Sequence, residues 1–92
     1  MRLVWTAAAV IDLEQISDYL LEKNPEIAAP IIRRIFESAL ELKRFPRRGR
    51  PGRKRGTREL VLTQLPYLLV YETVEESIRV LRVLHGARRW PE

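Results

Sequence analysis

Three residues near the end of the chain combine side chains that could bind a phosphate and transfer a proton. Arg82, His85 and Arg88 lie close together in the sequence. Guanidinium groups can clamp a phosphate, and an imidazole titrates near neutral pH, so it can supply one acid or base. The plain alternative for His85 is an imidazole at a strand end that packs beside Trp90 or bonds a backbone carbonyl. Both interpretations stay open from the sequence.

A second group of candidates comes from a concentrated run of positive charge. Residues 43–58, KRFPRRGRPGRKRGTR, hold nine of the 17 Lys and Arg residues and no acid, while the remainder of the chain sums to −4. This pattern predicts contacts with phosphate or with an acidic partner protein; the alternative is a solvated loop whose charge only aids solubility. The predicted target-binding or phosphate-binding residues are Arg47, Arg48, Arg50, Arg53, Lys54, Arg55, Arg58, Arg89 and Trp90.

The composition excludes several classes of site. The chain has no cysteine, which removes disulfides, thiolate catalysis and cysteine-based zinc sites, and its single histidine argues against a transition-metal site. No cofactor is implied. No signal-peptide pattern opens the chain and no apolar run approaches the roughly 20 residues that span a bilayer, so we expect a cytoplasmic protein without membrane contact. Residues 1–92 should form one domain with a small core.

The sequence around the candidate residues Arg82 and His85 predicts β-strands. Tyr67–Val74 and Ser77–His85 are dense in Val, Leu, Ile and Tyr, and the Glu-Glu-Ser break between them predicts a hairpin. Arg58–Thr63 predicts a third strand, returned antiparallel by Gln64–Pro66. Because the apolar residues are nearly continuous rather than alternating, both faces of this three-stranded meander should be at least partly covered.

The first half of the chain predicts a short strand and two helices. Arg2–Trp5 is a brief apolar segment that could pair with the later sheet, and Thr6 is a candidate N-cap for the first helix. Asn24–Pro25 reads as the start of a second helix that packs against the first as an antiparallel hairpin. Pro30 should either distort its first turn or delay the regular helix to about Ala29. Beyond this helix, the basic segment should be an irregular loop.

These elements predict an α+β fold. The order is strand, helical hairpin, basic loop and three-stranded antiparallel meander, with both helices on one face of a small four-stranded sheet. The other face should keep an exposed apolar patch, which usually marks a partner site. Arg79 and Arg82, three apart, should project to opposite faces, and the one that faces the helices needs a carboxylate such as Glu37 or Glu41.

Three segments of the chain resemble a known protein family. The segment FPRRGRPGRKRGTREL, the strand PYLLVY and the ending RVLRVLHGARRWP, in this order, are similar to the RelE/ParE superfamily of toxins from bacterial type II toxin–antitoxin modules. The resemblance covers essentially the whole chain. It implies a cognate antitoxin, whose C-terminal segment wraps this domain in a hetero-oligomer. Within the superfamily, ParE-type members poison DNA gyrase and RelE-type members cleave mRNA on the ribosome.

The resemblance implies a ParE-like rather than a RelE-like toxin. In the ribonuclease branch the strand that matches PYLLVY begins Tyr-Arg-Leu, and its arginine faces the scissile phosphate. Here that position is Leu68, which carries neither a charge nor a donor. The leading hypothesis is therefore a toxin that binds gyrase and blocks replication. The alternatives are a ribosome-dependent mRNA endoribonuclease that uses Arg82, His85 and Arg88, and a small basic nucleic-acid-binding module.

Overall fold

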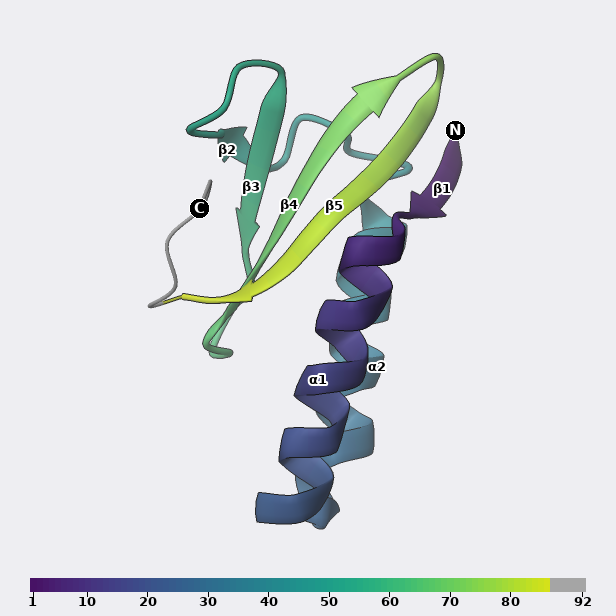
Figure 1. Ribbon diagram of the computed structural model, residues 1–92. Coiled ribbons are helices and arrows are strands. Elements are labelled where there is room, and N and C mark those ends of the chain that lie inside the picture. The colour runs from purple at the N-terminus through teal and green to yellow at the C-terminus, as the bar shows by residue number, and fades with distance from the viewer. Residues whose placement is uncertain (87–92) are drawn as a thin grey trace.

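A computed structural model of the chain describes residues 1–86 and shows two helices beside one twisted sheet (Figure 1). Arg88, Arg89 and Trp90 lie outside the described residues. The elements, in chain order, are β1 (Arg2–Trp5), α1 (Ala7–Lys23), α2 (Pro25–Glu41), β2 (Arg50–Pro51), β3 (Thr57–Val61), β4 (Tyr67–Val74) and β5 (Ser77–His85).

The predicted α+β fold is confirmed, with one strand more than expected. The sheet has the order β1-β5-β4-β3-β2, in which β3, β4 and β5 form the predicted antiparallel meander and β1 pairs with β5 in parallel. The fifth strand, β2, lies inside the basic segment, where Arg50 pairs with Glu59 and Pro51 with Arg58. The prediction of a wholly irregular loop there was wrong. Proline cannot donate to a central ladder, but it fits an edge strand such as β2.

Capping residues set the limits of the helical hairpin. Thr6 is the N-cap of α1, and its hydroxyl oxygen accepts the Ala9 N–H at 3.2 Å. Asn24 ends α1 and precedes Pro25, so the connection is tight, as predicted. α2 runs without interruption through Pro30, and the expected delay to Ala29 does not occur. Proline in this place removes only the bond to the Glu26 carbonyl in the first turn, which the rest of the helix tolerates. Within residues 1–86, neither helix is both long and apolar enough to cross a bilayer.

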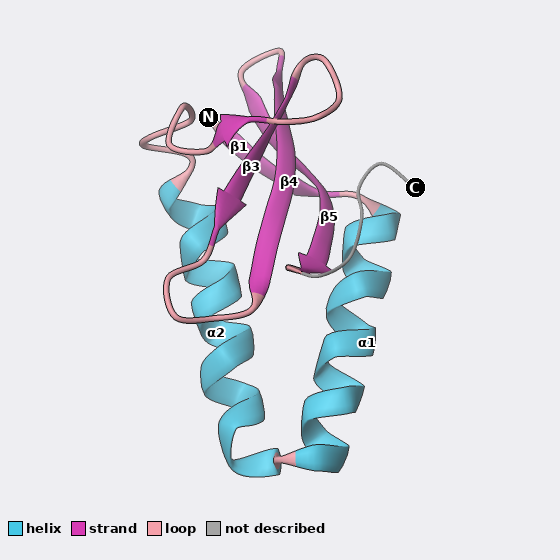
Figure 2. Ribbon diagram, turned by 90° about the vertical axis from the view of Figure 1, so that its left-hand side faces the viewer, coloured by secondary structure: helices cyan, strands magenta, loops and turns pink. Residues whose placement is uncertain are grey.

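The helices cover one face of the sheet (Figure 2). Both helices and the strands β4 and β5 contribute fully buried residues to the core between the two layers: Ala9, Ile35, Ala39, Leu69 and Val80. Small residues in both helices allow them to approach each other and the strands closely. The helices extend beyond the end of the sheet, so their far halves have helix neighbours but less sheet beneath them (Figure 2).

The opposite sheet face is less exposed than the sequence predicted. Val70 and Leu84, which lie on that face, are 0% and 1% exposed. Large exposed apolar side chains on it are Val61 and Val74, near strand ends. The predicted exposed apolar patch is therefore wrong for the centre of this face. Most of the large exposed apolar side chains among the described residues lie instead on the helices: Val10, Ile11, Tyr19, Leu21, Ile27, Phe36 and Leu40.

A β-bulge in β5 shifts the alternation of its side chains. Tyr71 pairs with Val80 but Val70 pairs with Arg82, so Leu81 is the extra residue. The shift lets Val80 and Val83, three apart, both join the core under the helices. The Thr6 hydroxyl donates to the carbonyls of Val80 and Leu81 at 2.9 and 3.1 Å, so the start of α1 is tied to the bulge.

The turn between β4 and β5 stores backbone strain that a substitution should relieve. Glu75 and Glu76 have φ angles of 47° and 61°, as a two-residue type I′ turn requires, and L-residues other than Asn and Gly adopt this region at a cost of about 1 kcal/mol each. We expect the variant Glu75→Asn/Glu76→Gly to raise the free energy of unfolding by about 1–2 kcal/mol in urea titration. The variant Glu75→Gln/Glu76→Gln is the control, since it removes the charges alone; an equal gain from it would contradict the strain explanation.

Candidate functional site

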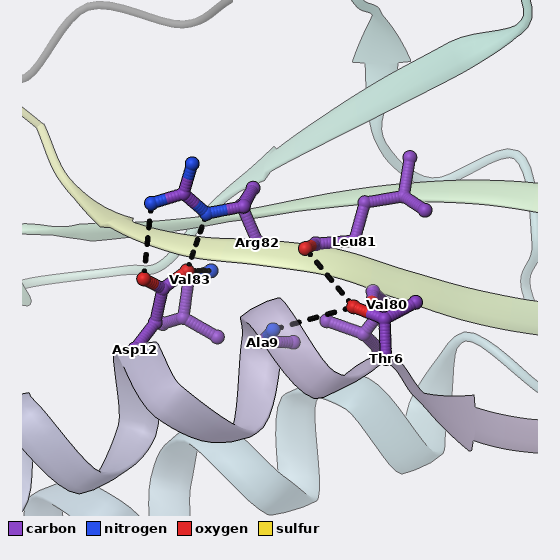
Figure 3. Close-up of polar contacts among 7 residues, drawn as sticks. All are labelled: Thr6, Ala9, Asp12, Val80, Leu81, Arg82 and Val83. Atoms are coloured by element: carbon purple, nitrogen blue, oxygen red, sulfur yellow. Dashed lines mark hydrogen bonds and ion pairs between the residues drawn. The ribbon is translucent and has the colours of Figure 1, made fainter.

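The predicted catalytic arginine Arg82 is half-buried and forms an ion pair with a buried carboxylate of α1. Its Nε and Nη2 donate to the two carboxylate oxygens of Asp12 at 2.7 and 3.0 Å, and the Val83 N–H donates to the same carboxylate at 2.9 Å (Figure 3). Asp12 is only 5% exposed. A fork-like pair of this kind fixes the guanidinium in one orientation. Arg82 therefore holds β5 against α1, and its contact with Asp12 would have to break before both nitrogens could turn to a phosphate.

The prediction that Glu37 or Glu41 would pair with the arginine facing the helices was wrong, because the partner of Arg82 is Asp12. Glu37 and Glu41 are exposed on α2, whereas β5 packs mainly against α1. The bulge also changes the predicted faces: Arg79 pairs with Glu72 and Arg82 with Val70, and these two β4 residues lie on the same face. Arg79 forms a partly exposed ion pair with Glu72 at 3.1 Å.

His85 lies at the end of β5 and is exposed. Its ring meets the ring of Tyr67 edge to face, with centroids 5.9 Å apart. Leu68, which replaces the arginine of the ribonuclease pattern, is half-buried. Of the predicted catalytic trio, the described residues include Arg82 in its ion pair and His85 beside an aromatic ring, while Arg88 lies outside them.

A groove of about 530 Å³ opens between the helical hairpin and the end of the sheet. Its walls come from the far halves of both helices and from the ends of β4 and β5: Ile16, Tyr19, Leu20, Ile27, Ile31, Tyr67, Val83 and His85. Most of this lining is apolar, with polar groups at Asp12, Gln15, Tyr19 and His85. Such a concave apolar surface with a few polar groups suits an amphipathic segment of another chain.

The basic segment is held in place by the buried phenol of Tyr71. The Tyr71 hydroxyl donates to the Pro46 carbonyl at 2.7 Å and accepts the Gly49 N–H at 2.9 Å. Arg58 donates to the Gly49 carbonyl at 2.7 Å. Gly49 is required here, because a Cβ on it would lie 2.8 Å from the Tyr71 ring. The segment is thus attached to the sheet core at its middle, and Arg58 acts in that attachment.

Two acids hold further parts of the same segment. Glu59, 5% exposed on β3, accepts Arg50 Nη2 at 3.1 Å and the Arg53 backbone N–H at 3.2 Å. Glu41, at the end of α2, forms an ion pair with Arg48. The segment therefore has a defined shape rather than that of a free loop.

The remaining cations of this segment lie at the surface. We call Arg47, Lys54 and Arg55, all exposed, together with the exposed side of Arg48, Arg50 and Arg53, the cationic rim. The structure brings the predicted target-binding residues of segment 43–58 to one edge of the sheet, around β2. The other two predicted residues, Arg89 and Trp90, lie outside the described residues.

The sequence did not indicate how four residues shape these surfaces. Asp12, Glu59 and Tyr71 are buried and orient the arginines, and Phe45 is an exposed ring with the guanidinium carbons of Arg44 and Arg48 at 5.4 and 5.0 Å from its centroid. Asp12 could have been found, because it lies three residues after Ala9 and four before Ile16, on the apolar side of its helix. The sequence held no comparable signal for Glu59 or Tyr71, whose partners are set by tertiary structure.

The two buried tyrosines predict a loss of stability at alkaline pH. Burial raises the pKa of the Tyr71 phenol above its ordinary value of 10.0, although the Gly49 N–H and Arg58 partly offset this. Burial and the neighbouring Tyr19 raise the pKa of Tyr67. The folded state therefore holds these protons more tightly than the unfolded chain, so the stabilisation is complete below pH 10 and is lost as the pH rises through the folded-state pKa values.

Denaturant titrations between pH 8 and about 11.5 should show this loss. We expect the free energy of unfolding of the Tyr67→Phe variant to fall less steeply above pH 10 than that of the wild type, because one titrating group is gone. Equal slopes for both proteins would contradict a role for this phenol.

Fold and surfaces together define a small α+β protein with two candidate binding surfaces: an apolar groove between the helices and the sheet, and a cationic rim at one edge. The family model described as the ParE toxin of the type II toxin–antitoxin system parDE matches residues 3–90. The chain belongs to this ParE toxin family, within the RelE/ParE superfamily.

Individual relatives agree with this assignment. The chain is 36% identical to Y4kP of Sinorhizobium fredii over 99% of this chain and 94% of the relative. It is 33% identical to toxin RelE2 of Caulobacter vibrioides over 95% of this chain and 97% of that toxin. Among solved structures, a chain of the chromosomal ParDE toxin–antitoxin system from P. aeruginosa superposes with a TM-score of 0.85 at 30% identity, covering 92% of this chain and 95% of that one.

Proposed function

We propose that this protein is a cytoplasmic toxin that acts by binding DNA gyrase, with the DNA that gyrase holds, and so blocks replication. The 92 residues act as one toxin domain in this proposal, and a cognate antitoxin neutralises it. The observation that carries the proposal is the cationic rim, which buried Tyr71 and Glu59 hold in a fixed shape at one edge of the sheet. A preorganised positive surface binds an anionic macromolecule with less loss of conformational entropy than a mobile loop.

The geometry favours binding over RNA cleavage. A ribonuclease of this fold needs groups that activate a ribose hydroxyl, stabilise a charged transition state and protonate the leaving oxygen. The Arg82 guanidinium instead donates its hydrogen bonds to Asp12. Leu68 carries no charge, and the His85 ring packs edge to face against the Tyr67 ring. These contacts support a structural role for Arg82 and place His85 in the lining of the groove.

The groove is the proposed site of the antitoxin. Its apolar walls suit one face of an amphipathic helix or an added extended segment, which the toxin–antitoxin family implies as a partner. An acidic segment would continue from the groove toward the cationic rim. Such a peptide should be disordered alone and should fold on binding.

Expression of the chain without an antitoxin in a susceptible cell tests this proposal. We expect growth arrest with a DNA damage response and without new mRNA cleavage sites. His85→Gln should leave the arrest unchanged, because the imidazole has no catalytic role in a binding mechanism. Arrest with cleaved mRNA, lost on His85→Gln, would establish the ribonuclease alternative.

A further inference from the structure

β1 forms one edge of the sheet, and in residues 1–86 no strand pairs with its outer side. Its inner side pairs with β5: the Arg2 N–H donates to the Glu76 carbonyl and the Thr6 N–H to the Val80 carbonyl, both at 3.1 Å. Successive residues of a strand direct their main-chain groups to alternate sides. The N–H and C=O groups of Leu3 and Trp5 therefore point away from β5.

This edge lacks the features that usually prevent strand pairing. Its centre, Leu3 to Trp5, is apolar and contains no lysine, proline or bulge. The Trp5 ring lies 5.0 Å from the ring of Phe36, centroid to centroid. Phe36 and Leu40 are one helical turn apart on α2 and are 40% and 52% exposed. The open edge therefore continues into an exposed apolar strip.

We propose that β1 pairs with β1 of a second copy of this chain, antiparallel about a two-fold axis at Val4. In this register Leu3 of one copy exchanges main-chain hydrogen bonds with Trp5 of the other, and the converse pair forms by symmetry. Val4 then stands beside Val4 of the other copy. The strand is self-complementary in this register, because Leu3 and Trp5, whose main-chain groups point outward, pair with each other across the axis.

The distribution of charge favours a second copy at this edge and not at the other. Seven of the nine cations of segment 43–58, those from Arg47 to Arg58, belong to the stretch of chain around β2 and β3, at the opposite end of the strand order from β1 (Figure 1). Two chains of net charge +5 would repel each other if their β2 edges met. Pairing through β1 places the two cationic rims at the far ends of one continuous sheet. Arg2, the charged residue of β1, faces Thr6 of the other copy in this register.

The expected dimer is weak, because the strand is short and the apolar strip is small. Interfaces at the small end of the known range form transient complexes, so we expect a dissociation constant of about 1–100 µM. Analytical ultracentrifugation of the purified chain from about 1 to 300 µM covers this range. We expect a monomer at the lowest and a dimer at the highest concentration.

Matched lysine substitutions locate the interface. Val4→Lys puts two like charges side by side across the proposed axis, which should weaken dimerisation at least tenfold. Val74→Lys is the control, since this valine lies on the same sheet face at the end of β4. Leu40→Gln, on exposed α2 surface, should also weaken the dimer while leaving the fold intact. Circular dichroism and the unfolding midpoint check that each variant is folded.

Three outcomes would overturn the proposal. The first is a wild-type monomer at every concentration. The second is a folded Val4→Lys variant that dimerises like the wild type. The third is a loss of the dimer in Val74→Lys equal to that in Val4→Lys, which would place the interface elsewhere.

Discussion

Replacing Asp12 with alanine should lower the free energy of unfolding by about 2–4 kcal/mol, because it removes the buried acceptor of the half-buried Arg82 guanidinium and of the Val83 N–H. Asp12 is 5% exposed and accepts all three hydrogen bonds described above. Small domains are stable by only about 5–15 kcal/mol, so this loss is a large part of the total. Urea unfolding of the purified variant at 25 °C measures it.

A double variant separates the charge pair from the packing. Asp12→Leu/Arg82→Met replaces both partners with apolar groups, which often restores most of the stability that either single change removes. We expect the double variant to be more stable than Asp12→Leu alone. An Asp12→Ala variant that loses less than about 1 kcal/mol, the level of an exposed pair, would show that the ion pair is not a main link between α1 and β5.

Reversing two charges of the cationic rim should weaken target binding roughly 100-fold, since like-charge contacts at an interface cost several kcal/mol. The variant Lys54→Glu/Arg55→Glu changes two exposed residues between β2 and β3. These side chains lie away from the Tyr71 and Glu59 contacts, so the fold should persist. The toxin concentration that gives half-maximal inhibition of the target measures the change.

Lys23→Glu/Arg33→Glu is the matched control. It exchanges one exposed lysine and one exposed arginine on the helices, so the net charge changes equally. We expect this control to stay within a few-fold of the wild type. Equal losses in both variants would mean that net charge acts at long range, and that the cationic rim is not the contact surface.

Much of the fold could be predicted because local signals agreed with the tertiary structure. Thr6 caps α1 as its hydroxyl and position predict, and the Tyr67–Val74 and Ser77–His85 segments form the expected hairpin. The short strand β2 could not be predicted, since Arg50–Pro51 has no strand propensity of its own. It forms because Glu59 and Tyr71 hold the chain beside β3, and these contacts join residues distant in sequence.

The candidate site was harder to predict for a related reason. Regular alternation along β5 would separate Val80 from Val83, and the bulge that brings them to one face has no sequence signal. The same bulge presents Arg82 and the Val83 N–H to Asp12. A residue that resembled a catalytic group in the sequence therefore joins β5 to α1 through Asp12, while most cations of the basic segment lie exposed at the surface.

The most direct test is a plasmid supercoiling and cleavage assay with purified gyrase, beside a ribosome-dependent mRNA cleavage assay with the same toxin preparation. At micromolar toxin we expect supercoiling to stop and cleaved DNA to accumulate, with mRNA intact and with the effect lost in Lys54→Glu/Arg55→Glu. Full gyrase activity at that concentration, together with cut mRNA, would contradict the proposed function.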